Sequence, residues 1–283
     1  MKELFFKIVI TGFFIRSLIA FSQEEQRYKL PSQLNEISGL EIINDSLFVA
    51  INDSGNEPLL FVLNSDAKIE KTVKINGAEN NDWEDLTVDE EHIYIGDFGN
   101  NLNKRKELII YKVKIKDVLF KNEVQSERIF FRYLDQKEFP PQMESRNFDS
   151  EAFFYDKDSL TLFTKCNTSP WTGISFLYRI PKEPGTYLLK KTDKLYIGPG
   201  GYFLDAITAA DKHGEYIYLT TYNRILILKK EGSKYNIYRT IYFNEITQKE
   251  SIVVLNKSCL FFADEKHRIF GGGILTKYNI SND

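Results

Sequence analysis

The chain contains 283 residues, of which 42% are hydrophobic, 27% charged and 14% aromatic, and its formal net charge is −3. This composition is typical of a folded globular protein and excludes a disordered chain and a polytopic membrane protein. The charge lacks the basic excess of nucleic-acid-binding proteins, so we expect no nucleic-acid partner. Two cysteines and three histidines are too few for a disulfide scaffold, a four-thiolate zinc site or a multi-histidine metal centre.

The first 22 residues have the pattern of a secretory signal peptide. A basic start and a short apolar run are followed by small residues, Ala20 and Ser22, at positions −3 and −1 of a cleavage site after Ser22. A retained membrane anchor is the alternative, but Arg16 interrupts the run, which is shorter than the ~20 residues of a membrane span. We therefore expect removal of residues 1–22 and a secreted or periplasmic mature protein, residues 23–283, with no membrane span.

The remainder of the chain predicts an all-β fold built from repeats. Short runs rich in Ile, Val, Phe, Tyr and Leu alternate with turns rich in Asp, Asn, Gly and Ser, and these runs recur as units of about four strands. An acidic residue opens each unit, at intervals of 48, 67, 54 and 45 residues. These opening residues are Glu36, Glu84, Glu151, Asp205 and Glu250. Such a period is typical of a β-propeller.

We predict a single β-propeller domain with five four-stranded blades. The fifth unit lacks an outer strand at the C-terminus, and residues 28–31 can supply it, so that an N-terminal strand closes the ring. Six blades are the alternative if residues 117–141 contain further strands. A β-sandwich or jelly roll would not explain the acidic residue that recurs at the start of each unit.

In a propeller, the start of each innermost strand and the end of the second strand meet at one mouth of the central channel. The strand ends in this chain bring Asn52, Asp53, Asp97, Lys165, Tyr222, Asp264 and Glu265 to that face. Clustered carboxylates repel one another unless protons, basic groups, backbone amides or a cation compensate them. Calcium fits such a site because it takes 6–8 oxygen ligands. Alternatively, the acidic residues are structural staples that accept backbone hydrogen bonds from neighbouring blades.

Three motifs resemble a largely uncharacterised family of secreted bacterial β-propellers. They are residues 52–55 (NDSG), 82–85 (DWED) and 96–101 (GDFGNN), and the similarity continues at residues 149–152 and 263–265. The family is distantly similar to calcium-bearing phytase-like and gluconolactonase-like propellers. The resemblance implies that acidic residues at the channel mouth hold a metal.

Repeats and resemblance together give a candidate site. The predicted metal ligands are Glu36, Asp53, Glu84, Asp97, Glu151 and Glu250. The predicted ligand-binding residues are Asn52, Asn100, Asp205, Tyr222, Asp264 and Glu265. Lys165 is the candidate catalytic residue, because an ammonium at this mouth can stabilise developing negative charge.

Two functions follow from this site. The first is recognition: a secreted propeller that binds a divalent cation, Ca²⁺, together with a small molecule, glycan or protein on the channel face. The second is metal-assisted hydrolysis of an ester, lactone or phosphoester, in which the metal polarises an oxygen or activates water. We favour recognition because the sequence contains no complete catalytic constellation.

Overall fold

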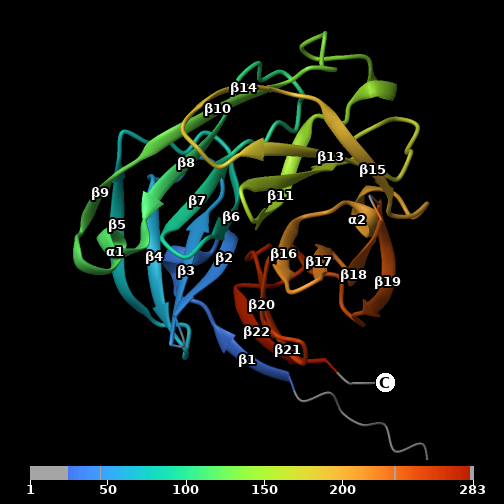
Figure 1. The fold of residues 1–283 in the computed structure, drawn as a ribbon. Helices are drawn as coiled ribbons and strands as arrows, with labels where there is room; N and C mark the ends of the chain where they lie inside the picture. The colour runs from blue at the N-terminus through green and yellow to red at the C-terminus, as the bar shows by residue number, and fades with distance from the viewer. Residues whose placement is uncertain (1–24, 45, 233, 281–283) are drawn as a thin grey trace, which may run out of the picture.

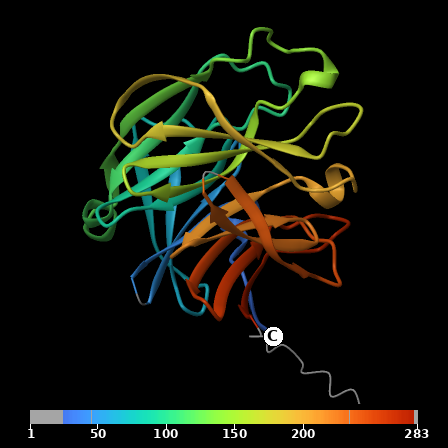
Figure 2. The same ribbon diagram turned by 45° about the vertical axis from the view of Figure 1, so that its right-hand side comes forward.

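The computed structural model describes residues 25–44, 46–232 and 234–280, so the predicted signal peptide lies outside the described residues. Five small, mainly antiparallel sheets are arranged around a central channel (Figure 1, Figure 2). This arrangement confirms the predicted five-bladed β-propeller. None of the helices in the described ranges is long and apolar enough to cross a bilayer.

Blades 1 and 2 each contain five strands. From the channel outward, blade 1 consists of β2 (Ile37–Asn44), β3 (Leu47–Asn52), β4 (Leu59–Asn64) and β5 (Ile69–Asn76). Blade 2 consists of β6 (Trp83–Val88), β7 (His92–Asp97), β8 (Leu108–Lys114) and β10 (Glu127–Tyr133). A parallel fifth strand covers each outer edge: β9 (Glu123–Gln125) on β5, and β14 (Gly185–Leu189) on β10. Helix α1 (Ile115–Phe120) joins β8 to β9, so residues 117–141 contain no sixth blade.

The remaining blades contain four strands each. Blade 3 consists of β11 (Asp149–Asp156), β12 (Ser159–Lys165), β13 (Ile174–Pro181) and β15 (Lys191–Tyr196). Blade 4 consists of β16 (Ala209–His213), β17 (Tyr216–Thr221), β18 (Arg224–Glu231) and β19 (Lys234–Tyr242). Blade 5 consists of β20 (Lys249–Asn256), β21 (Cys259–Asp264), β22 (Ile274–Asn279) and β1 (Glu25–Lys29). The connecting segments include α2 (Tyr202–Asp205) and the short 3₁₀ helices η1 (Ser32–Leu34) and η2 (Met143–Ser145).

The first strand of the chain closes the ring. β1 pairs antiparallel with β22, and the backbone N–H of Leu30 extends this contact by donating to Gly273 O at 2.9 Å. The closing strand was predicted, but β1 starts earlier than residues 28–31. It ends before Pro31, which has no N–H to donate to a sheet.

Five apolar clusters hold the blades together, one at each junction between neighbouring blades. At the junction of blades 2 and 3, for example, Phe98 packs edge-on against Phe153 with ring centroids 5.1 Å apart. Cys166 and Cys259 are both buried and are not bonded to each other. Because each blade shares its apolar face with the next, the polar side chains are left to the channel and the loops.

Candidate cation site at the channel mouth

The channel mouth is built from two recurring positions in the blades. The first is a β-bulge near the start of the innermost strand in four of the blades, where one extra residue interrupts the pairing with the second strand. The extra residues are Ser38, Glu84, Glu151 and Glu250. A bulge re-aims the side chain of the extra residue. Here it directs three carboxylates and one hydroxyl to the mouth.

The second position lies at the end of the second strand of each blade. It supplies Asp53, Lys165, Tyr222 and Glu265 to the same mouth. In blade 2 the equivalent residue is Phe98, which packs into the core instead. Together with Tyr202 and Gln248, these side chains enclose a polar cavity of about 170 Å³.

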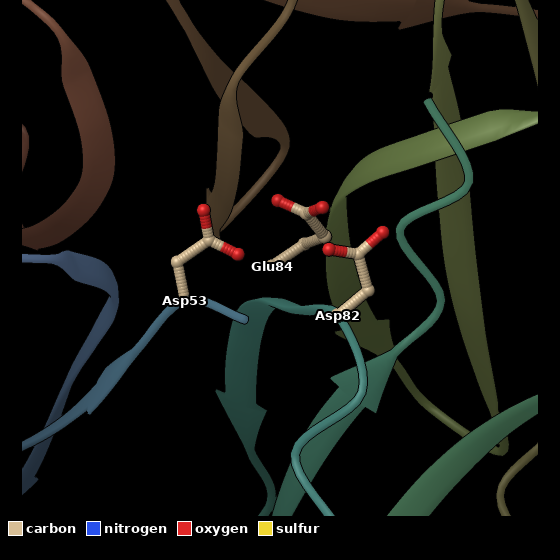
Figure 3. A group of neighbouring side chains, drawn as sticks. All are labelled: Asp53, Asp82 and Glu84. Carbon is tan, nitrogen blue, oxygen red and sulfur yellow. The ribbon is translucent and has the colours of Figure 1, made fainter. Parts of the chain in front are cut away.

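Five carboxylates form two groups that share one member. We call Asp53, Asp82 and Glu84 the outer triad, because the first two are partly exposed. Figure 3 shows their carboxylates directed into a common space. We call Glu84, Asp149 and Glu151, which are all buried, the inner triad. Within each triad, one oxygen from each residue lies within 4.8 Å of the other two.

A glycine allows this close approach. A Cβ atom at Gly99 would overlap Glu84 Oε1 and the carboxylate of Asp82. Only glycine therefore lets the β7–β8 loop pass so near to both side chains. This gives a physical reason for the second glycine of the GDFGNN motif.

Few hydrogen-bond donors reach the triads. Within the described part of the chain, the carboxylates of Asp82 and Glu84 accept no hydrogen bond, although Glu84 is only 6% exposed. Asp149 Oδ1 accepts a hydrogen bond from the backbone N–H of Asn100 at 2.6 Å, whereas its buried Oδ2 has no partner among the described residues. Buried polar oxygens are normally satisfied, so the unpartnered Oδ2 of Asp149 requires an explanation.

Two basic side chains lie beside the triads. Lys165 Nζ is 3.0 Å from Glu151 Oε2, and it lies above the rings of Tyr202 and Tyr222 at 5.2 and 5.5 Å from their centroids. Arg105 contacts Asp97, outside the triads, at 2.7 Å. Lys165 is therefore the basic group that directly compensates a triad carboxylate.

Burial and mutual repulsion raise the pKa values of this group. Burial, followed by the charges of Glu151 and Asp53, raises the pKa of Glu84 well above its usual value. Burial and then Glu151 do the same to the pKa of Asp149. The pKa of Asp82 is raised to about 6, chiefly by burial and then by Asp53. Burial opposes the charged form of Lys165, but Glu151 and other negative neighbours raise its pKa. The cavity therefore favours an added positive charge.

Other buried carboxylates act as staples between blades. Asp85 accepts backbone N–H groups of Leu86, Phe153 and Ala210 at 2.9, 3.1 and 3.4 Å, which joins blades 2, 3 and 4. Asp211 accepts the N–H of Val254 from blade 5 at 2.6 Å. The carboxylate of Glu84 accepts no such hydrogen bond from the described residues. Carboxylates thus do act as staples in this molecule. In the second unit, however, the staple is Asp85 and not Glu84, the acidic residue that was predicted to open the unit.

The structure separates the predicted metal ligands. Asp53, Glu84 and Glu151 belong to the triads, and Glu250 lines the cavity without joining either triad. Two further predicted ligands lie elsewhere. Asp97 is fully buried and accepts hydrogen bonds from Asn81, Arg105 and the backbone N–H of Asp82. Glu36 is exposed and accepts a hydrogen bond from Asn56.

The predicted ligand-binding residues also divide. Tyr222 and Glu265 line the cavity. The other four make structural contacts: Asn52 donates to Gln33 O, Asn100 donates to Phe148 O, Asp205 pairs with Arg224, and Asp264 accepts a hydrogen bond from Thr247. Asp205 lies in α2, and the position expected for it at the start of blade 4 is occupied by Thr208, immediately before β16. Glu36 was likewise aligned with the bulge position of blade 1, which Ser38 occupies.

Sequence reasoning missed Asp82 and Asp149. Both lie two residues before the glutamate of a bulge, in Asp82-Trp83-Glu84 and in Asp149-Ser150-Glu151. This Asp-x-Glu spacing recurs in two neighbouring units. It is the signal that identifies the two residues from sequence.

No protein-family model and no curated protein matches this chain. Among solved structures, the chain is similar to glutaminyl cyclase from Myxococcus xanthus, with 13% identity, a TM-score of 0.55, and coverage of 91% of this chain and 96% of that chain. It is also similar to virginiamycin B lyase from Staphylococcus aureus, with 11% identity, a TM-score of 0.45, and coverage of 91% and 99%. A chain of a nidogen–laminin complex matches with 12% identity, a TM-score of 0.46, and coverage of 81% and 72%. At these identities the similarity concerns the fold alone.

Proposed function

We propose that this propeller binds Ca²⁺ at its channel mouth through the outer triad and uses the bound cation to recognise a ligand. The proposal rests mainly on Glu84, which belongs to both triads. This residue is only 6% exposed, and its carboxylate accepts no hydrogen bond from the described residues. An unpaired buried charge is costly unless a counter-charge compensates it. A dication between Asp53, Asp82 and Glu84 supplies that charge.

The chemistry of the donors favours calcium. Both triads consist of carboxylates, which are hard oxygen ligands, without histidine or cysteine. Calcium accepts 6–8 oxygens in flexible geometry, whereas magnesium requires a near-ideal octahedron. The cavity of about 170 Å³ has room for water or ligand oxygens to complete the coordination shell.

The contact of Ser38 argues against one form of catalysis, in which a serine acts as the nucleophile. Its hydroxyl donates to the backbone carbonyl of Glu84, so it is not activated by a base. An oxygen-bearing small molecule, glycan or protein side chain would coordinate the cation, with Tyr202 and Tyr222 beside it on the cavity wall. Hydrolysis of an ester, lactone or phosphoester is the second candidate, favoured by the Lys165 ammonium on the same wall.

Thermal unfolding tests cation binding. Protein treated with a chelator is melted alone, with millimolar Ca²⁺, and with millimolar Mg²⁺. Calcium at about 100 times its Kd should raise the Tm by roughly 5–10 °C, since a ligand of the native state stabilises it by mass action. Glu84→Gln should abolish the shift, while the matched control Glu36→Gln, at an exposed glutamate outside both triads, should retain it. An unchanged Tm in the parent protein, or an undiminished shift in Glu84→Gln, contradicts the proposal.

A second assay separates recognition from hydrolysis. The calcium-loaded protein and Glu84→Gln are compared on a panel of esters, lactones and phosphoesters. Recognition predicts no calcium-dependent turnover. Turnover that needs calcium and is lost in Lys165→Met would support the hydrolase instead.

A further inference from the structure

Glu84 is a member of both triads, and each triad by itself has the dimensions of a calcium site. Calcium–oxygen bonds are about 2.3–2.6 Å long, so two ligands of one ion lie at most about 5 Å apart. Each triad satisfies this limit separately, because its three oxygens lie within 4.8 Å of one another. A carboxylate has two oxygens, and Glu84 can therefore contact one cation on each side.

Asp149 provides an independent indication of an inner cation. Its side chain is fully buried, and its Oδ1 already accepts the hydrogen bond from Asn100. Its Oδ2 has no partner among the described residues. Asp149 belongs to the inner triad and not to the outer one, so a cation in the outer triad alone would leave this oxygen unsatisfied.

Glu151 also has one carboxylate oxygen without a hydrogen bond. Its Oε2 accepts the hydrogen bond from Lys165 at 3.0 Å, and within the described ranges its Oε1 accepts none. Glu151 and Asp149 therefore each retain one oxygen that accepts no hydrogen bond from the described residues. Both residues come from β11, so one rigid strand holds them in place.

The charges of the five carboxylates fit two dications. Arg105 is paired with Asp97 outside the triads, and Lys165 is the ammonium in contact with a triad member. Within the triads, five ionised carboxylates and one ammonium leave four negative charges, and Glu250 and Glu265 lie on the same cavity wall. One dication compensates half of the charge of the triads, and two compensate the triads in full.

We propose that the channel mouth holds two divalent cations, one in each triad, with the Glu84 carboxylate shared between them. The inference rests on the proposed function and extends it by a second, inner site formed by Glu84, Asp149 and Glu151. The outer cation lies between Glu84 and two partly exposed residues, Asp53 and Asp82, and the inner cation lies in the fully buried triad.

Native mass spectrometry of the full chain, stripped with a chelator and titrated with Ca²⁺, tests the stoichiometry. The parent protein should bind two calcium ions. Asp149→Asn should bind one, because only the inner triad is damaged, and Asp53→Asn should bind one, because only the outer triad is damaged. Glu84→Gln should bind none. Asp66→Asn, at an exposed aspartate in the β4–β5 turn, should still bind two.

The possible results distinguish failure of the inner cation site from failure of the proposed function. One ion in the parent protein, lost in Asp53→Asn and retained in Asp149→Asn, would overturn the inner site and leave the proposed function intact. Absence of any ion in the parent protein would overturn both. A second ion that persists in Asp149→Asn and in Asp53→Asn alike would show binding outside the triads. Calorimetric titration of the parent protein gives the stoichiometry again without relying on any variant.

Discussion

Glu84 and Asp85 are neighbours in the chain with opposite surroundings. The bulge directs Glu84 to the cavity, where its carboxylate accepts no hydrogen bond from the described residues. Asp85 points between blades and accepts three backbone N–H groups. Burial raises the pKa of Asp85 as well, but its backbone hydrogen bonds oppose this effect and would be lost in part in an amide, so we expect the two amide variants to have opposite effects on stability.

Glu84→Gln should raise the Tm of the cation-free protein by a few degrees at about pH 8. The amide removes a charge that burial and neighbouring carboxylates disfavour, as their effect on the pKa of Glu84 indicates. Differential scanning calorimetry in the presence of a chelator measures the change. A lower Tm would show that the carboxylate makes a stabilising contact.

Asp85→Asn should lower the Tm. An amide has one acceptor oxygen where the carboxylate has two, so at least one buried N–H group loses its partner at a cost of about 1–3 kcal/mol. For a domain of this size that corresponds to a decrease of roughly 2–10 °C. The same calorimetric scan checks it, with Glu84→Gln as the adjacent control. Equal stability of Asp85→Asn and the parent would contradict stapling by this residue.

At the scale of strands, the sequence predicts the blades better than their edges. Short apolar runs with a regular period were sufficient to predict five blades and the closing strand. A bulge adds one residue without disturbing the apolar pattern, so the alignment placed Glu36 and Asp205 where the structure has Ser38 and Thr208. The parallel strands β9 and β14 were also not predicted, because they arise from connections rather than from the repeat.

The site shows the same division. The ends of the second strands were located from the repeat, and they gave Asp53, Lys165, Tyr222 and Glu265, which line the cavity. Asp82 and Asp149 were missed because Asp82 directly precedes its strand and Asp149 is the first residue of its strand. At such positions the repeat of apolar residues does not show in which direction a side chain points. Their proximity to Glu84 depends on how blades 2 and 3 meet, which is a tertiary property.

The closing strand should be essential for stability. A chain of residues 31–283 lacks β1 and Leu30, and thereby exposes the edge of β22 and part of the apolar cluster between blades 5 and 1. Loss of one buried leucine costs about 1.5–3 kcal/mol, so the Tm should fall by at least about 3 °C relative to residues 23–283. Size-exclusion chromatography should also show self-association through the open edge. A monomer of unchanged Tm would contradict this role for β1.

In the whole molecule, the carboxylates of the mouth connect stability to pH. The pKa of Asp82 is raised to about 6 by burial and by Asp53, from a usual value near 3.8. The pKa values of Glu84 and Asp149 are raised as well, in each case chiefly by burial. A group whose pKa is higher in the folded state favours folding while it is protonated and loses that contribution as pH rises through the folded-state pKa. These groups should therefore make the cation-free protein less stable as the pH rises from about 4 toward neutrality.

A bound dication should reverse this dependence. Calcium binds the deprotonated carboxylates, so protons compete with it at low pH and leave the triads free at high pH. The increase in Tm caused by calcium should accordingly be small at about pH 5 and several degrees larger at about pH 8. Scans at both pH values, with Glu84→Gln as the control that responds at neither, measure the difference. Equal shifts at the two pH values would mean that the cation binds away from the carboxylates whose pKa values are raised, because only binding to those groups couples calcium to their protons.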